Sequence, residues 1–66
     1  MVHTVEFCEA RAREAGDEAR STKLANVRER ALRSEAAWRA MADRLIGVRR
    51  ERESIDIERT LREQAP

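Results

Sequence analysis

Few residue types in this chain could perform chemistry. It contains one cysteine, Cys8, and one histidine, His3, and tyrosine is absent. These two side chains are five positions apart and lie on different faces of a helix, so they do not form a zinc site, which takes four ligands. No nucleophile, base and acid stand at a catalytic spacing, and there is no glycine-rich phosphate loop. We therefore expect no enzymatic activity, no cofactor or metal, and no small-molecule substrate.

The thiol and the imidazole each have a simpler interpretation. A reactive thiol needs basic neighbours or a second ligand, and Cys8 has neither in the sequence. We predict that Cys8 is a small buried hydrophobic residue. His3 stands alone near the N-terminus, and we predict that it is solvated.

Arginine is the other residue type with a chemical use, because its guanidinium group binds phosphate. Residues 27–52 carry eight arginines and four acids, whereas residues 1–20 carry three arginines and five acids. This asymmetry has two interpretations, complementary helix faces or a basic strip for nucleic-acid phosphates. The candidate phosphate contacts are Arg44, Arg49, Arg50 and Arg52. The interleaved acids argue against a membrane-surface helix, and a formal net charge of +1 argues against an obligate nucleic-acid binder.

Length and composition predict a small all-α domain that needs additional stabilisation. A chain of 66 residues forms one domain at most and buries only about 60% of its unfolded surface. One cysteine excludes an internal disulfide. Two glycines and one proline leave long stretches rich in Ala, Arg and Glu without helix breakers. A second subunit is the stabilising element that remains.

The apolar residues also indicate where the protein resides. There is no run of 18 apolar residues, so no transmembrane helix is expected. The sequence "MVHTVEFCEA" lacks a basic region followed by an apolar one, so no secretory signal is expected. A lone cysteine suits a reducing compartment, and we expect a cytoplasmic protein.

Apolar and small residues in the first third of the chain predict one amphipathic helix. They recur at alternating spacings of three and four, at Val5, Cys8, Ala12, Ala15 and Ala19. We place the first helix at residues 4–20, with Thr4 as its N-cap. The turn is expected at residues 21–26, because Ser21 and Thr22 can each cap a following helix, and Asn26 with Glu29 resembles a capping box. Gly16 is a rival C-terminal cap, which would shorten this helix.

The second helix has the longest periodic signal. The three-four alternation continues over about four heptads, at Leu24, Val27, Ala31, Ser34, Trp38, Met41, Leu45 and Val48. Extending it reaches Arg52 and Ile55, while Leu32 and Ile46 widen the apolar stripe on one side. We place this helix at residues 26–48 or longer, with an interruption expected at Gly47. Residues 49–66 form a charged C-terminal extension, helical or frayed, in which Ile57 and Leu61 make a different stripe.

A turn near residue 22 or 23 fixes the expected register of the hairpin. Small residues then face one another near the turn. Phe7 and Cys8 lie beside Trp38, and Val5 lies opposite Met41. Large residues therefore gather at the open end, and Trp38 is expected to be a core anchor.

One helix lined with alanine cannot cover the large side chains of the other. The simplest closure is a twofold dimer of two antiparallel hairpins, which makes a four-helix bundle. The predicted interface with a second copy or another protein partner consists of Val27, Leu32, Trp38, Met41, Leu45, Ile46 and Val48.

The sequence thus predicts an all-α, two-helix antiparallel hairpin. Its expected function is that of a small non-enzymatic interaction or regulatory protein, acting through homodimerisation and through a protein partner. The alternative is a nucleic-acid-binding module that uses the arginine-rich face of the second helix.

The segment "LANVRERALRSEAAWRAMADRL" resembles short uncharacterised helical-hairpin proteins of alphaproteobacteria. The matching positions are Asn26 to Arg30 together with Ala37, Trp38, Met41 and Ala42. The resemblance covers residues 8–46 and implies a bacterial, cytoplasmic helical hairpin. It implies no particular function.

Overall fold

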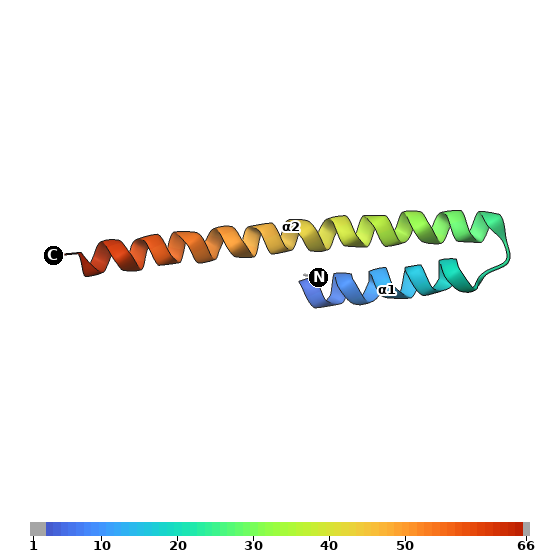
Figure 1. The fold of residues 1–66 in the computed structure, drawn as a ribbon, viewed down its shortest axis with the longest axis horizontal. Coiled ribbons are helices and arrows are strands. Elements are labelled where there is room, and N and C mark those ends of the chain that lie inside the picture. Colours follow the sequence, from blue (N-terminus) through green and yellow to red (C-terminus); the bar gives the residue numbers. More distant parts are fainter. Residues whose placement is uncertain (1–2, 66) are drawn as a thin grey trace.

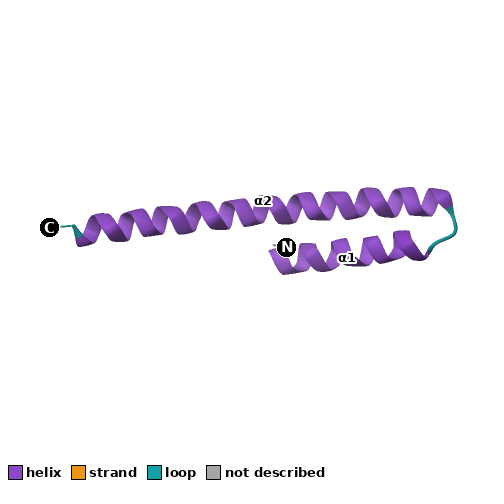
Figure 2. Ribbon diagram, viewed as in Figure 1, coloured by secondary structure: helices purple, strands orange, loops and turns teal. Residues whose placement is uncertain are grey.

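The protein is an antiparallel hairpin of two helices, as predicted. The computed structural model describes residues 3–65, in which α1 spans Val5–Ser21 and α2 spans Ala25–Gln64. Thr4 caps α1, because its hydroxyl oxygen accepts a hydrogen bond from the Phe7 amide at 3.0 Å. This bond satisfies one of the amides that a helix start leaves without a partner. The two helices lie side by side and no strand occurs among the described residues (Figures 1 and 2).

The turn is shorter than the predicted 21–26, and α2 begins before the predicted cap. Leu24 is the N-cap and its side chain makes no capping hydrogen bond. The Thr22 hydroxyl accepts from the Leu24 amide at 3.2 Å, and Arg28 Nη2 donates to the Thr22 carbonyl at 3.0 Å. Asn26 lies inside the first turn of α2, so the predicted capping box with Glu29 is wrong. A cap contributes only about 1 kcal/mol, and these contacts close the turn without it.

The second helix is more than twice as long as the first. It has 40 residues against 17 and runs through Gly47 without a break. Partly buried side chains on α2 end at Ile46, and every residue from Gly47 to Ala65 is exposed. We call residues 47–64 the overhang. It extends past the start of α1, which lies near the middle of α2 (Figure 1), and it makes the molecule a rod of 66 × 17 × 17 Å.

Small side chains form the contact between the helices. The buried apolar residues are Val5, Cys8, Ala12, Ala15, Ala19, Ala31 and Ala42. Cys8 is fully buried, which confirms its predicted role as a small hydrophobic residue. Because alanine lines both sides, the helices approach closely, but the buried apolar area is small. The large side chains of α2 are therefore left at the borders of the contact.

Gly16 lies inside α1, where it is buried against a side chain of α2, so it is not a C-terminal cap. A Cβ atom at this position would overlap the carboxylate of Glu35 on α2. That carboxylate is only 18% exposed and accepts from Arg39 Nη2 at 3.2 Å. The predicted register places the partner of Gly16 earlier on α2 than Glu35. Glu35 nevertheless contacts the glycine, because its side chain reaches diagonally over it.

The two glycines give a matched test of this contact. Alanine in a helix is more stable than glycine by about 0.5–1 kcal/mol. Gly47 has open space around it, so Gly47→Ala is expected to raise the free energy of unfolding by this amount. Gly16→Ala must move the carboxylate end of Glu35 away from Arg39, so its gain is expected to be smaller. Chemical denaturation of both variants measures the difference, and an equal gain at the two positions would show that the contact of Gly16 with Glu35 has no effect on stability.

Candidate interaction surface

Trp38 lies in an aromatic cluster that spans both helices. Its ring meets the Phe7 ring edge-on, with centroids 5.7 Å apart, as the register predicts. The His3 ring stacks on Phe7 at 5.0 Å and meets Trp38 edge-on at 5.4 Å. Edge-to-face and offset-stacked pairs at these separations are favourable. The prediction of a solvated His3 is therefore wrong, because a lone histidine can pack against rings that only the fold brings near it.

A guanidinium group completes this cluster. Arg11 Cζ lies 5.6 Å from the centroid of a Trp38 ring, within the range of a cation–π contact. Arg11 Nη1 also donates to Glu14 Oε2 at 3.1 Å. The spacing of Phe7, Arg11 and Glu14 places them along one edge of α1, and His3 stacks on Phe7 from the residues just before the helix. Trp38 is partly buried, and His3, Phe7 and Arg11 contact its ring.

A line of apolar residues continues from Trp38 along α2. Met41 and Leu45 are partly buried, whereas Val48 and Ile55 are 46% and 54% exposed. Phe7, beside Trp38, is 41% exposed. We call this surface the seam face, made of Phe7 together with Val27, Ser34, Trp38, Met41, Leu45, Val48, Arg52, Ile55, Arg59 and Arg62. Large exposed apolar side chains aligned in this way are typical of an interface rather than of a free surface.

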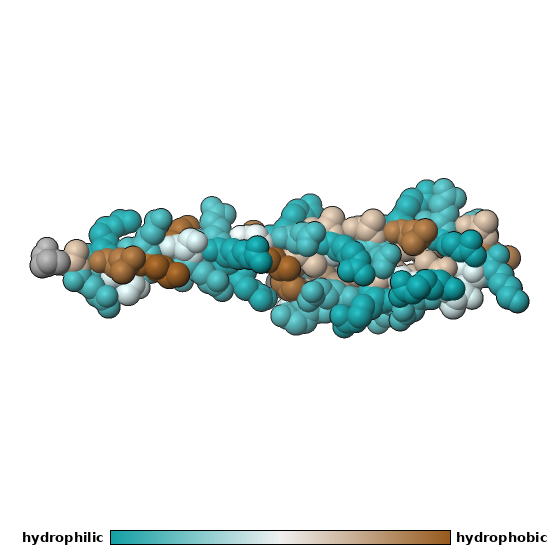
Figure 3. Space-filling model, in the orientation of Figure 1, coloured by the Kyte–Doolittle hydropathy of each residue, from teal (hydrophilic) through white to brown (hydrophobic). Residues whose placement is uncertain are grey.

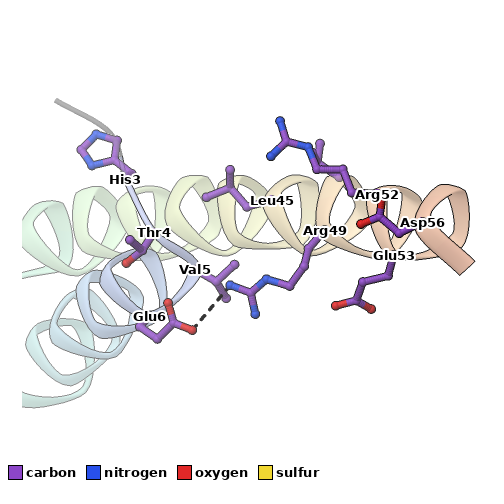
Figure 4. Close-up of a pocket in the computed structure, with 10 residues that line it drawn as sticks. His3, Thr4, Val5, Glu6, Leu45, Arg49, Arg52, Glu53 and Asp56 are labelled. Atoms are coloured by element: carbon purple, nitrogen blue, oxygen red, sulfur yellow. Dashed lines mark ion pairs between the residues drawn. The ribbon is translucent and has the colours of Figure 1, made fainter. Parts of the chain in front are cut away.

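An open pocket of about 470 Å³ lies where α1 begins and the overhang starts. Figure 4 shows His3, Thr4, Val5 and Glu6 on one side of it, and side chains of α2 on the other. Those from α2 are Leu45, Val48, Arg49, Arg52, Glu53 and Asp56. Arg49 Nη2 lies 3.6 Å from Glu6 Oε1, the one ion pair between the two helices in residues 3–65. The pocket is thus a continuation of the seam face, with an apolar floor and charged rims.

Two further apolar pairs lie away from the seam face. Ile57 and Leu61, four residues apart, are 60% and 63% exposed on another side of the overhang. Leu32, which is exposed, and Ile46, which is partly buried, lie on a side of α2 different from that of Trp38. Brown apolar patches accordingly interrupt the charged surface along the half of α2 that extends past α1 (Figure 3). Of the predicted interface residues, Leu32 and Ile46 do not share the face of Trp38, because their helical positions differ.

The predicted phosphate contacts do not form one strip. Arg44, Arg49, Arg50 and Arg52 are all exposed. Their spacing distributes them around α2, since each residue of a helix turns by about 100°. Arg49 is paired with Glu6, and Glu53 and Asp56 line the same pocket as Arg52. These four arginines therefore do not converge on a single point where a phosphate could bind.

Within residues 3–65 there is no group of three or more His, Cys, Asp or Glu side chains that could hold a metal. Neither helix of the described chain has a stretch long and apolar enough to cross a membrane. Comparisons with protein-family models, with curated proteins and with solved structures found no match to this chain. The geometry of the hairpin is therefore the basis for a functional proposal.

Sequence reasoning found Trp38 and the apolar line on α2, and it placed Phe7 beside Trp38. It missed His3, Arg11 and Gly16 as parts of the contact between the helices. Gly16 had a signal in the sequence, because a glycine between Ala15 and Ala19 on an apolar stripe is typical of close packing. His3 and Arg11 had none, since their roles depend on where α2 places Trp38.

Proposed function

We propose that the protein is a small non-enzymatic interaction protein that acts by associating with a second copy of itself, and through that dimer with a protein partner. The observation that carries the proposal is the seam face, which remains open along the overhang. Its residues Val48 and Ile55 are each about half exposed. Fully burying a side chain of this size is worth roughly 1.5–3 kcal/mol.

The small contact between the helices supports the same proposal. A single hairpin buries mainly alanine side chains, and an isolated chain of this length is marginally stable. Burial of the seam face against another molecule would add the apolar area that α1 does not provide. A second copy is the partner that is always present, and a twofold dimer is the commonest closed assembly.

Light scattering over a concentration series tests the proposal. We expect a mass of twice 7.6 kDa at high micromolar concentration, with a shift toward the single chain on dilution. The melting temperature should also rise with concentration, because dimerisation stabilises the folded state by mass action. A single chain at every concentration, with a cooperative melt that does not depend on concentration, would contradict self-association.

Nucleic-acid binding through the arginines of α2 is the alternative function. It has less support, because the four candidate arginines lie on different sides of α2 and carboxylates lie among them. These arginines are Arg44, Arg49, Arg50 and Arg52. Binding by phosphate contacts weakens steeply with salt. A mobility shift with DNA or RNA at low salt that disappears as salt is added would favour this alternative.

The cytoplasm is the compartment we propose. Cys8 is a free, buried thiol, which suits a reducing environment.

A further inference from the structure

We infer that the second copy packs antiparallel, with the overhang of each chain lying in the groove between α1 and α2 of the other. This inference rests on the proposed function, and it names the surface and the direction of the self-association. The twofold axis crosses α2 near residues 46 and 47, where α1 ends its coverage. Each half of the dimer then contains three helical segments side by side, which are α1 and α2 of one chain and the overhang of the other. This arrangement differs from the four-helix bundle expected from the sequence.

The arginines of the seam face decide the direction. The exposed part of this face carries Arg52 between Val48 and Ile55, and Arg59 and Arg62 after Ile55. In a parallel dimer each of these arginines would meet its own copy, and like charges placed together in an interface are strongly unfavourable. In the antiparallel dimer Arg52 lies opposite Met41 of the second copy. Likewise Arg59 lies opposite Ser34 and Arg62 opposite Ala31.

An acidic residue on α1 complements the last of these arginines. The edge of α1 that holds Phe7 and Arg11 continues to Glu14 and Glu18, both exposed. The overhang runs in the same direction as α1 of the second copy, so its later turns lie beside these two acids. In the register that sets Ile55 beside Phe7, Arg59 is level with Arg11, one turn before Glu14, and Arg62 is level with Glu14. Arg62 is thus positioned to pair with Glu14.

The outer parts of the contact are also complementary in net charge. Residues 53–65 carry four acids and two arginines, and residues 28–40 of α2, which lie opposite, carry four arginines and two acids.

The antiparallel register also covers the exposed large side chains of the groove. Ile55 lies opposite Trp38 and next to Phe7 of the second copy, and Val48 lies opposite Leu45. The open pocket at the start of α1 receives the other chain's α2 as it enters the groove. The overhang is long enough to span the length of α1, so one contact buries the seam face of both chains.

Distances between spin labels test the direction. The variants carry Cys8→Ala, which removes the native thiol, and one new cysteine, Leu61→Cys or Arg50→Cys, each on the side of α2 away from the seam face. In the antiparallel dimer the Leu61 labels lie about 29 residues apart along the helix axis, or about 45 Å at 1.5 Å per residue, and the Arg50 labels only about 10 Å. We therefore expect the Leu61 distance to exceed the Arg50 distance by about 20 Å once the width of the helix pair is included.

Other results have distinct meanings. Equal distances at the two positions, in a sample whose mass is that of a dimer, would overturn the antiparallel arrangement and leave the proposed function standing. A single-chain mass without any label–label distance would overturn both. Circular dichroism of each labelled variant verifies that the helices are intact.

Discussion

Replacing Ile55 with glutamate is expected to abolish most of the self-association. Ile55 is half exposed in the single chain, and a dimer buries it twice because the contact is symmetric. Because about half of the side chain is already covered, each copy loses roughly half of the 1.5–3 kcal/mol that full burial provides, and each introduces a carboxylate that must be desolvated. The loss of apolar burial alone is about 1.5–3 kcal/mol per dimer, which weakens the dissociation constant by at least about 10-fold. Sedimentation equilibrium or light scattering against concentration measures this change.

Ile57→Glu is the matched control for that experiment. Ile57 is 60% exposed on the same helix, two residues away, and lies outside the seam face. The substitution makes the same chemical change at nearly the same exposure and helical position. We expect the dissociation constant of this variant to stay close to that of the unchanged protein. Equal weakening by both variants would show that the overhang associates without using the seam face.

The periodicity of the sequence was sufficient to predict the architecture. Apolar residues spaced by three and four fix which side chains share a helix face. This rule placed Cys8 in the contact between the helices and Phe7 beside Trp38, and the structure confirms both. It also showed that Val48 and Ile55 continue the line of Trp38. Their exposure could not be read from the periodicity, because it depends on where α1 begins in the folded hairpin.

The parts that could not be predicted depend on small energies or on tertiary neighbours. An Asn26 cap is worth about 1 kcal/mol, too little to fix where α2 begins against the contacts of Thr22 and Arg28. Gly47 costs a similar amount, which the helix formers around it outweigh, so α2 continues. The position of Gly16 on the apolar stripe indicates close packing, but its contact with Glu35 depends on the conformation of the Glu35 side chain. The packing of His3 follows only from the positions of Phe7 and Trp38.

Replacing Trp38 with alanine is expected to lower the free energy of unfolding by about 2–4 kcal/mol, below the full value for a buried tryptophan because the ring is partly exposed. The variant loses the ring contacts with Phe7 and His3 and the cation–π contact with Arg11. For a domain of this size, 1 kcal/mol shifts the melting temperature by about 4–8 °C. Thermal or chemical denaturation followed by circular dichroism measures the loss.

A control separates the role of Trp38 from a general effect of truncating an apolar residue. Leu32→Ala removes an exposed apolar side chain of the same helix, outside the seam face, and should change stability by no more than about 0.5 kcal/mol. An unchanged melt of Trp38→Ala would contradict the aromatic cluster.

The role of Trp38 within the chain and its role between chains can be distinguished by a double-mutant cycle with Ile55→Glu. The antiparallel register places Ile55 of one chain on Trp38 of the other, so their effects on association should be coupled. In the dissociated Ile55→Glu background, Trp38→Ala should retain the part of its effect that comes from Phe7, His3 and Arg11. Its effect on the dissociation constant should be largely lost there, because Ile55 no longer packs on the ring. Full additivity of the two substitutions on association would place the two residues apart in the dimer.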